Sequence, residues 1–171
     1  MNRALSEELK NMAVEDQAMR KRVRNGFEWD YSVDRKNTRR LKEIIKEFGW
    51  PTVGLVGKRG SRNAWLFVQH ADEDRNFQRQ ILNLITKLYK KDQNSIDPIS
   101  IPYLTDRLLV AEEKEQEFGT QFSINDDNKL VLRPLREPNQ VNERRAKYGL
   151  YPIEKDVEDA RKYKETIKSK K

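Results

Sequence analysis

The stretch LSEELKNMAVEDQAMRKRV, residues 5–23, has an apolar side chain at nearly every third or fourth position. That spacing keeps these side chains on one face of an α-helix, so we predict a helix from about Asn2 to Arg24. The positions of this stripe are Leu5, Leu9, Met12, Asp16, Met19 and Val23. Asp16 is its one polar member, at a position where leucine is expected.

Outward from this helix, the same periodicity predicts further helices, and a change to alternation predicts one hairpin. Three glycines mark residues 50–62 as a loop, and Ser61 and Ser100 are each expected to cap the helix that follows. The remaining predicted helices cover about residues 34–48, 62–71, 73–90, 101–117, 139–148 and a last one from Pro152, and the strands contain Phe122 to Ile124 and Leu130 to Leu132.

The expected fold is therefore mainly α, a single-domain helical bundle of about seven helices with one small β-hairpin. We expect a helical domain over residues 1–152, with the hairpin near 120–133. Residues 153–171 are expected to form a C-terminal helix with a basic tail.

The composition argues against several classes of protein. The chain has 171 residues and no cysteine, which excludes a disulfide scaffold, a thiol nucleophile and a cysteine zinc site. No apolar run approaches the roughly 20 residues of a membrane span, and the polar start shows no signal region. We therefore expect a cytoplasmic protein that does not associate with membranes.

The net charge of +7 is concentrated at one end of the chain. Six basic residues and one acidic residue lie between Arg161 and Lys171, so five of the seven excess charges belong to this segment. A nucleic-acid-binding protein normally carries a basic face on its folded body. We expect a solvated tail, and binding of nucleic acid through it is a third hypothesis.

Asp16 is the first candidate functional residue, because a buried carboxylate must be paired, protonated or directed into a cavity. Arg20, four residues later, can form an ion pair with it. Such a pair would either fix helix packing or leave Asp16 as a base or ligand in a pocket. Gln17 could contribute only from the flank of the stripe.

The second candidate is the segment Gln69-His70-Ala71-Asp72, which follows an apolar run typical of a buried helix. His70 is the only histidine of the chain, and imidazole exchanges protons near neutral pH. It is either an acid/base or a core histidine bonded to a backbone carbonyl. Asp72 either orients it or caps the next helix.

Two more groups could contact a ligand. Arg107 lies at the edge of an apolar stripe, where it could pair with Asp72 or Asp16 or hold an anion, whereas Asp106 is expected to point away from that stripe. Thr120 and Gln121 follow a helix end and either form a turn or present hydrogen-bonding groups to a ligand.

Several familiar chemistries are missing from the sequence. The glycines have the wrong spacing for a phosphate-binding loop, there is no His-Glu-x-x-His, and no Gly-x-Ser-x-Gly elbow occurs. We predict no metal ligands and name no cofactor, with magnesium bound by Asp16, Asp72 and Asp106 as the weaker alternative.

A set of short motifs resembles a family of uncharacterised bacterial proteins, a domain-of-unknown-function group. The segments that carry the resemblance are Asp16-Gln17 with Arg20, residues 37–41, Gly49-Trp50-Pro51-Thr52 with Gly57, Ala64-Trp65-Leu66, residues 69–72, residues 104–107, Gly119-Thr120-Gln121, and Arg145 with Gly149-Leu150. The resemblance covers about residues 5–152. It implies no activity, and it leaves the basic tail outside.

The leading hypothesis is an enzyme that acts on a small polar metabolite, either anionic or uncharged, as a hydrolase or transferase. His70 is its expected acid/base, with Asp72 or Asp16 as orienting group and Arg20 or Arg107 as the substrate anchor. The residues expected to place the substrate are Gln69, Gln121 and Thr120. The alternative is a non-catalytic module that binds a ligand or a protein, in which these groups form a buried structural network. The oligomeric state is left open.

Overall fold

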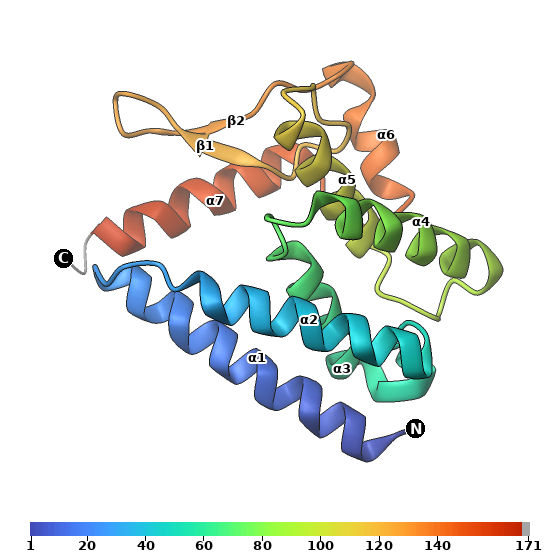
Figure 1. The fold of residues 1–171 in the computed structure, drawn as a ribbon. Coiled ribbons are helices and arrows are strands. Elements are labelled where there is room, and N and C mark those ends of the chain that lie inside the picture. Colours follow the sequence, from blue (N-terminus) through green and yellow to red (C-terminus); the bar gives the residue numbers. More distant parts are fainter. Residues whose placement is uncertain (169–171) are drawn as a thin grey trace. The chain divides into compact units, whose positions relative to one another are not determined.

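The computed structural model describes residues 1–168 (Figure 1). Within that range the chain forms seven α-helices, one 3-10 helix and one antiparallel hairpin, which confirms the mainly α fold. The elements are α1 (Arg3–Arg24), α2 (Tyr31–Phe48), α3 (Val53–Gln69), α4 (Arg75–Lys91), α5 (Ser100–Ala111), β1 (Phe122–Ile124), β2 (Leu130–Leu132), the 3-10 helix Pro138–Gln140, α6 (Val141–Ala146) and α7 (Ile153–Lys168).

The chain divides into two compact units, Met1–Asp97 and Pro98–Lys171. This division groups α7 with the hairpin, because α7 packs on β2 and α6. The expected division into a helical domain over residues 1–152 and a C-terminal helix with a basic tail over residues 153–171 stays a prediction. Part of the predicted basic tail lies outside the described residues. The structure describes neither residues 169–171 nor several side chains in the last turns of α7.

In the first unit α3 packs against α1, α2 and α4, and most extensively against α1 (Figure 1). The α1 stripe is buried as predicted at Leu5, Leu9, Met12 and Met19. Capping explains where the first two helices begin. The side chain of Asn2 accepts a hydrogen bond from the Leu5 amide, and that of Asp30 accepts one from the Ser32 amide.

Helix α3 begins nine residues earlier than the predicted start at residue 62, so the expected loop over residues 50–62 is wrong for most of its length. Thr52, rather than Ser61, caps the helix by accepting from the Leu55 amide. Gly57 has φ 76° and interrupts the helix, a conformation that glycine adopts without strain. Glycine is required at residue 60 for a different reason. A Cβ at this position would lie 2.8 Å from Cβ of Val56, which is too close for a real contact.

In the second unit, β1 and β2 pair with Phe122 opposite Leu132 and Ile124 opposite Leu130, as predicted for the hairpin. Helix α5 ends at Ala111 instead of 117, and Ser100 is its first residue rather than a side-chain cap. The predicted helix 139–148 is shorter as well, and forms a 3-10 turn followed by α6.

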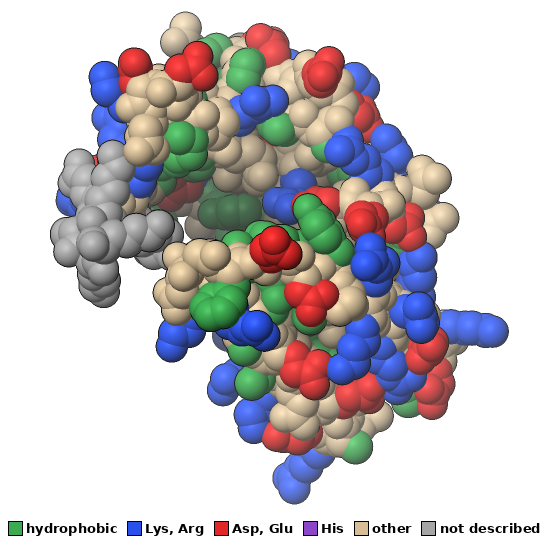
Figure 2. Space-filling view, turned by 60° about the vertical axis from the view of Figure 1, so that its left-hand side comes forward, with side chains coloured by type: hydrophobic (Ala, Val, Ile, Leu, Met, Phe, Trp, Pro, Cys, Tyr) green, Lys and Arg blue, Asp and Glu red, His purple; other side chains and the backbone are tan. Residues whose placement is uncertain are grey.

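None of the described helices combines the length and the apolar character that crossing a bilayer demands. On the face shown in Figure 2, acidic and basic side chains are interspersed.

Candidate functional site

The candidate site is a cluster of four ionisable side chains in the first unit. Asp16 and Arg20 come from α1, Asp34 from α2, and His70 from the C-terminal end of α3. Nδ1 of His70 lies 2.8 Å from Oδ1 of Asp16. Nε of Arg20 lies 3.0 Å from Nδ1 of His70, and Nη2 of Arg20 donates to Oδ1 of Asp34 at 2.6 Å. Three helices are therefore joined at one point.

The carboxyl group of Asp16 is fully buried. Burial by itself raises its pKa, but the hydrogen bond and charge of His70, the charge of Arg20 and the hydrogen bond from Gln17 together hold this pKa below the ordinary 3.8. The Gln17 amide donates to Oδ2 of Asp16 at 2.7 Å, from the flank of the stripe as predicted. Asp16 is thus an ionised carboxylate at neutral pH.

The ionised state of Asp16 decides which nitrogen of His70 carries the proton. Nδ1 faces a donor, Nε of Arg20, and an acceptor, Oδ1 of Asp16, and it cannot satisfy both. Because Asp16 has no proton to donate, Nδ1 must donate to the carboxylate at 2.8 Å, which is the shorter contact. The lone pair of the neutral ring then lies on Nε2, an atom with no hydrogen bond to any described residue.

Trp29 closes the cluster from the segment between α1 and α2. Its indole Nε1 donates to Oδ2 of Asp34 at 3.3 Å, and the Arg20 guanidinium lies 4.9 Å from the ring centroid. One face of the indole therefore covers a cation that already has two carboxylate neighbours, Asp16 at 3.3 Å and Asp34. This arrangement fixes the guanidinium in place.

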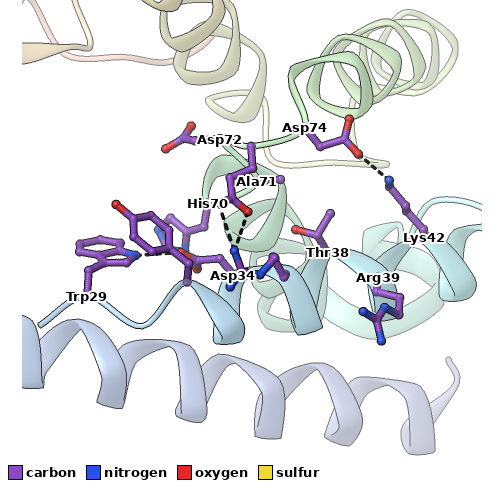
Figure 3. Close-up of a pocket in the computed structure, with 12 residues that line it drawn as sticks. Trp29, Asp34, Thr38, Arg39, Lys42, His70, Ala71, Asp72 and Asp74 are labelled. Atoms are coloured by element: carbon purple, nitrogen blue, oxygen red, sulfur yellow. Dashed lines mark hydrogen bonds and ion pairs between the residues drawn. The ribbon is translucent and has the colours of Figure 1, made fainter.

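Beside the cluster is a cavity of about 380 Å³, which falls in the size range of small-molecule sites. One wall is the face of α2 from Tyr31 to Lys42, and the other is the segment His70–Asp74 between α3 and α4. In Figure 3, Trp29 lies at one end and the ion pair of Lys42 with Asp74, at 2.5 Å, lies at the other. His70 lines this cavity, and its side chain is 18 % exposed.

The structure brings together three of the residues expected in the site, namely Asp16, Arg20 and His70. Asp72 lines the cavity but is exposed, and its Oδ1 accepts from Nε2 of Gln78 at 3.3 Å. The carboxylate against the imidazole is thus that of Asp16. Asp72 does not cap α4 either, because Asp74 accepts from the Phe77 amide.

Sequence reasoning missed Asp34 and Trp29. Asp34 is half-buried and precedes the buried residues Asn37 and Leu41 of α2 by one and two helical turns, so the 3-4 spacing could have identified it in the same way as Asp16. It appeared instead as the first residue of a predicted helix, where an acidic residue is ordinary. Nothing in the sequence indicates that Trp29 folds back over Arg20.

Arg107, Thr120 and Gln121 belong to the second unit. Thr120 donates from its hydroxyl to Asp106, and the Gln121 side chain donates to the Thr120 hydroxyl at 3.1 Å, which is the turn chemistry considered as the alternative. Arg107 is half-buried on α5. Their roles toward a substrate stay predictions.

Asp106, expected to point away from the stripe of Leu104 and Leu108, is nevertheless not exposed to solvent. Its carboxylate is fully buried and accepts hydrogen bonds from the backbone amides of Glu117, Phe118 and Thr120 at 2.7–3.2 Å. It thereby anchors the segment that follows α5, and this explains why that helix stops early. Asp106 is a structural group of the second unit.

Some buried polar atoms near the cluster have no hydrogen-bond partner among the described residues. They include Nη1 of Arg20, the side-chain amide of Asn37 and Nε2 of Gln69. Asn37 follows Asp34 by one helical turn, and Gln69 directly precedes His70. Unpaired buried donors and acceptors are rare in folded proteins and indicate water or a ligand.

Asp16, Asp34 and His70 also form a group that could hold a metal ion, since one ligand atom of each lies within 4.8 Å of the others. The weaker magnesium hypothesis had named Asp72 and Asp106 beside Asp16. The guanidinium of Arg20 contacts all three members of the observed group. It supplies the positive charge that a metal ion would bring.

The fold and this cluster define a mainly helical protein with a buried Asp–His–Arg–Asp site beside a cavity. A family model matches residues 3–166, and the chain belongs to that family, DUF6624, a family of unknown function. The predicted resemblance to an uncharacterised family is confirmed, and the match continues through most of α7, beyond the expected limit at residue 152. Neither curated proteins nor solved structures gave a match.

Proposed function

We propose that this protein is an enzyme that uses His70 as a general acid and base on a small polar metabolite, in a hydrolase or transferase reaction. The observation that carries the proposal is the 2.8 Å contact between Nδ1 of His70 and the buried carboxylate of Asp16, at the wall of a cavity. A carboxylate on Nδ1 leaves Nε2 as the proton acceptor, as in the histidine bases of acyl-transfer enzymes.

In the proposed reaction, Nε2 of His70 takes a proton from a water molecule or a substrate hydroxyl as its oxygen attacks an electrophilic centre. The imidazolium then gives that proton to the leaving group, so the enzyme returns to its starting state. Two carboxylates face one guanidinium in the cluster, and the remaining negative charge stabilises the imidazolium. Asp16 is thus a positioning and charge-stabilising residue.

The role of Arg20 differs from the one expected from the sequence. Its Nε lies against Nδ1 of His70, and its Nη2 contacts Asp16 and Asp34. We therefore assign it to holding the Asp–His pair rather than to binding the substrate. A small-molecule ligand in the cavity and a cytoplasmic location complete the proposal, which does not include nucleic-acid binding.

The second candidate is a non-catalytic binding module in which the cluster only fixes helix packing. The observation that favours it is that the ion pair is shielded from solvent, because Asp16 is fully buried and the side chain of Arg20 is only 10 % exposed. Buried polar networks of this kind can specify one packing arrangement. The position of His70 at the cavity wall favours the enzyme.

The test compares the wild type with His70→Gln and Asp16→Asn, which keep side-chain size. Each is incubated with a bacterial metabolite extract and with chromogenic aryl phosphates and esters, and conversion is followed by mass spectrometry or absorbance. We expect wild-type turnover that falls roughly 100-fold or more in His70→Gln. Far-UV circular dichroism checks that the fold is retained.

Arg62→Gln serves as a matched control, since Arg62 is exposed and lies on α3 outside the cluster. Equal conversion by the wild type and His70→Gln would exclude His70 as the base. Loss of stability in both cluster variants, without any His70-dependent conversion, would favour the binding module.

A further inference from the structure

We propose that the cavity beside His70 binds a ligand that combines a planar ring with an anionic group, as nucleotides and aryl carboxylates do. The inference rests on the proposed function, because it names the class of substrate for the same site. It depends on different residues, however: Trp29, Tyr31, Thr38 and Arg39, all of which line the cavity.

The aromatic side chains form one end of the cavity. Trp29 and Tyr31 are 43 % and 53 % exposed, and their ring centroids lie 6.1 Å apart. Trp29 is held by its hydrogen bond to Asp34, with the Arg20 guanidinium 4.9 Å from its ring. An indole that is fixed in place and still widely exposed offers a stacking surface at little entropic cost.

The cations of the cavity differ in whether they have partners. Arg35 pairs with Glu73 at 3.3 Å, and Lys42 pairs with Asp74 at 2.5 Å. Arg39 has no ion pair or hydrogen bond to any residue that the structure describes. It is therefore the cation of the wall that remains available to an anionic ligand.

Thr38 adds a hydroxyl beside this arginine. Its side chain lines the cavity from α2, and in Figure 3 it extends toward the segment that carries Ala71. Like Arg39, it has no hydrogen bond to a described side chain. A ring stacked on Trp29 would place its substituents along the same wall of α2, past His70 and toward Thr38 and Arg39.

The test measures binding rather than turnover, by isothermal titration calorimetry on the full chain. The probes are AMP and indole-3-acetate, which carry a ring with a phosphate or a carboxylate, adenosine, which has the ring alone, and ribose 5-phosphate, which has the anion alone. We expect the wild type to bind at least one of the two ring-bearing anions more tightly than adenosine or ribose 5-phosphate. If only AMP binds, the anionic group of the ligand is a phosphate. If only indole-3-acetate binds, it is a carboxylate.

The variants Trp29→Ala and Arg39→Gln are each expected to weaken that binding roughly tenfold. Trp29→Phe keeps a ring and should lie between wild type and alanine. The matched controls are Tyr151→Ala, an exposed aromatic of the second unit, and Arg62→Gln, and both should bind as the wild type does.

The inference is overturned if neither ring-bearing anion binds the wild type at about 1 mM, or if both cavity variants bind like their controls. His70→Gln separates this result from the proposed function, because it should keep binding and lose turnover. Binding that depends on Trp29 and Arg39, without any His70-dependent turnover, would sustain the inference and refute the proposed enzyme. Turnover that depends on His70, without binding that depends on Trp29 and Arg39, would refute the ligand class and leave the proposed enzyme standing.

Discussion

His70 and Asp16 lie 54 residues apart in the sequence, yet Nδ1 of the imidazole and Oδ1 of the carboxylate are 2.8 Å apart in the fold. Both atoms also contact the Arg20 guanidinium. Nδ1 therefore faces an acceptor, the Asp16 carboxylate, and a competing donor, Nε of Arg20. The chemistry of the site depends on which of these contacts prevails.

The tautomer of His70 can be measured directly, because the chain has one histidine. Nitrogen NMR of protein labelled at histidine should show the Nδ1–H form of the neutral ring in the wild type. In Asp16→Ala the acceptor is gone, so Arg20 Nε becomes the partner of Nδ1 and the proton should move to Nε2. Asp16→Asn retains an acceptor oxygen and is the control. An unchanged tautomer in the alanine variant would show that Asp16 does not set it.

Asp16 should also make stability depend on pH in a defined direction. Its folded-state pKa is lower than the 3.8 of the unfolded chain, so ionised Asp16 stabilises the fold above pH 3.8. That contribution should decline as the pH falls from 3.8 through the lower folded-state value. We expect the difference in unfolding free energy between wild type and Asp16→Asn, measured in urea, to shrink over this acidic range.

The control for this pH series is Asp126→Asn, at an exposed position of the hairpin turn. It should follow the wild type throughout. A difference between wild type and Asp16→Asn that grows on acidification would contradict the argument, since it would require a raised pKa for Asp16.

Removal of Arg20 should convert the cluster into a metal site. Asp16, Asp34 and His70 place ligand atoms within 4.8 Å of one another, and the guanidinium supplies their positive counter-charge. We expect Zn²⁺ to raise the melting temperature of Arg20→Met more than that of the wild type, because carboxylates and imidazole are zinc ligands. An equal rise in both proteins would show that the metal and Arg20 do not compete.

Asp106 should prove structural rather than functional. Replacement by asparagine leaves one acceptor oxygen and turns an NH₂ group toward the backbone amides of Glu117, Phe118 and Thr120. We expect Asp106→Asn to lower the unfolding free energy by roughly 2 to 4 kcal/mol. Thr120→Ala, which removes one of the hydrogen bonds, should cost about 1 kcal/mol.

The functional control for Asp106→Asn is the NMR signal of His70, which belongs to the other unit and should not change. A stability equal to that of the wild type would contradict the anchoring role. It would mean that the segment after α5 is held by other contacts.

The features that could be predicted are those that arise from neighbours along the chain. The α1 stripe identified both the helix and Asp16, because a charge among Leu9, Met12 and Met19 breaks a local rule. His70 stood out for a similar reason, at the end of an apolar run. Alternation likewise predicted the pairing of β1 with β2.

The errors arose where distant groups decide the local structure. Three glycines predicted a loop where α3 begins, because glycine on average disfavours a helix. In the structure, Gly57 provides a break within α3, and Gly60 allows a close approach to Val56. The prediction of a helix through residue 117 did not take the Asp106 carboxylate into account. Asp106 accepts a hydrogen bond from the Glu117 amide, and α5 ends at Ala111.

The sequence by itself determined that this protein is mainly helical and that Asp16 and His70 stand in places meant for apolar side chains. Periodicity carries that information, because each helical face is set by spacing along one segment. The tertiary structure alone decided that Asp34 and Trp29 complete the cluster and that Asp16, rather than Asp72, faces the imidazole. Hydrogen bonds between helices depend on how those helices pack, and no local spacing records that.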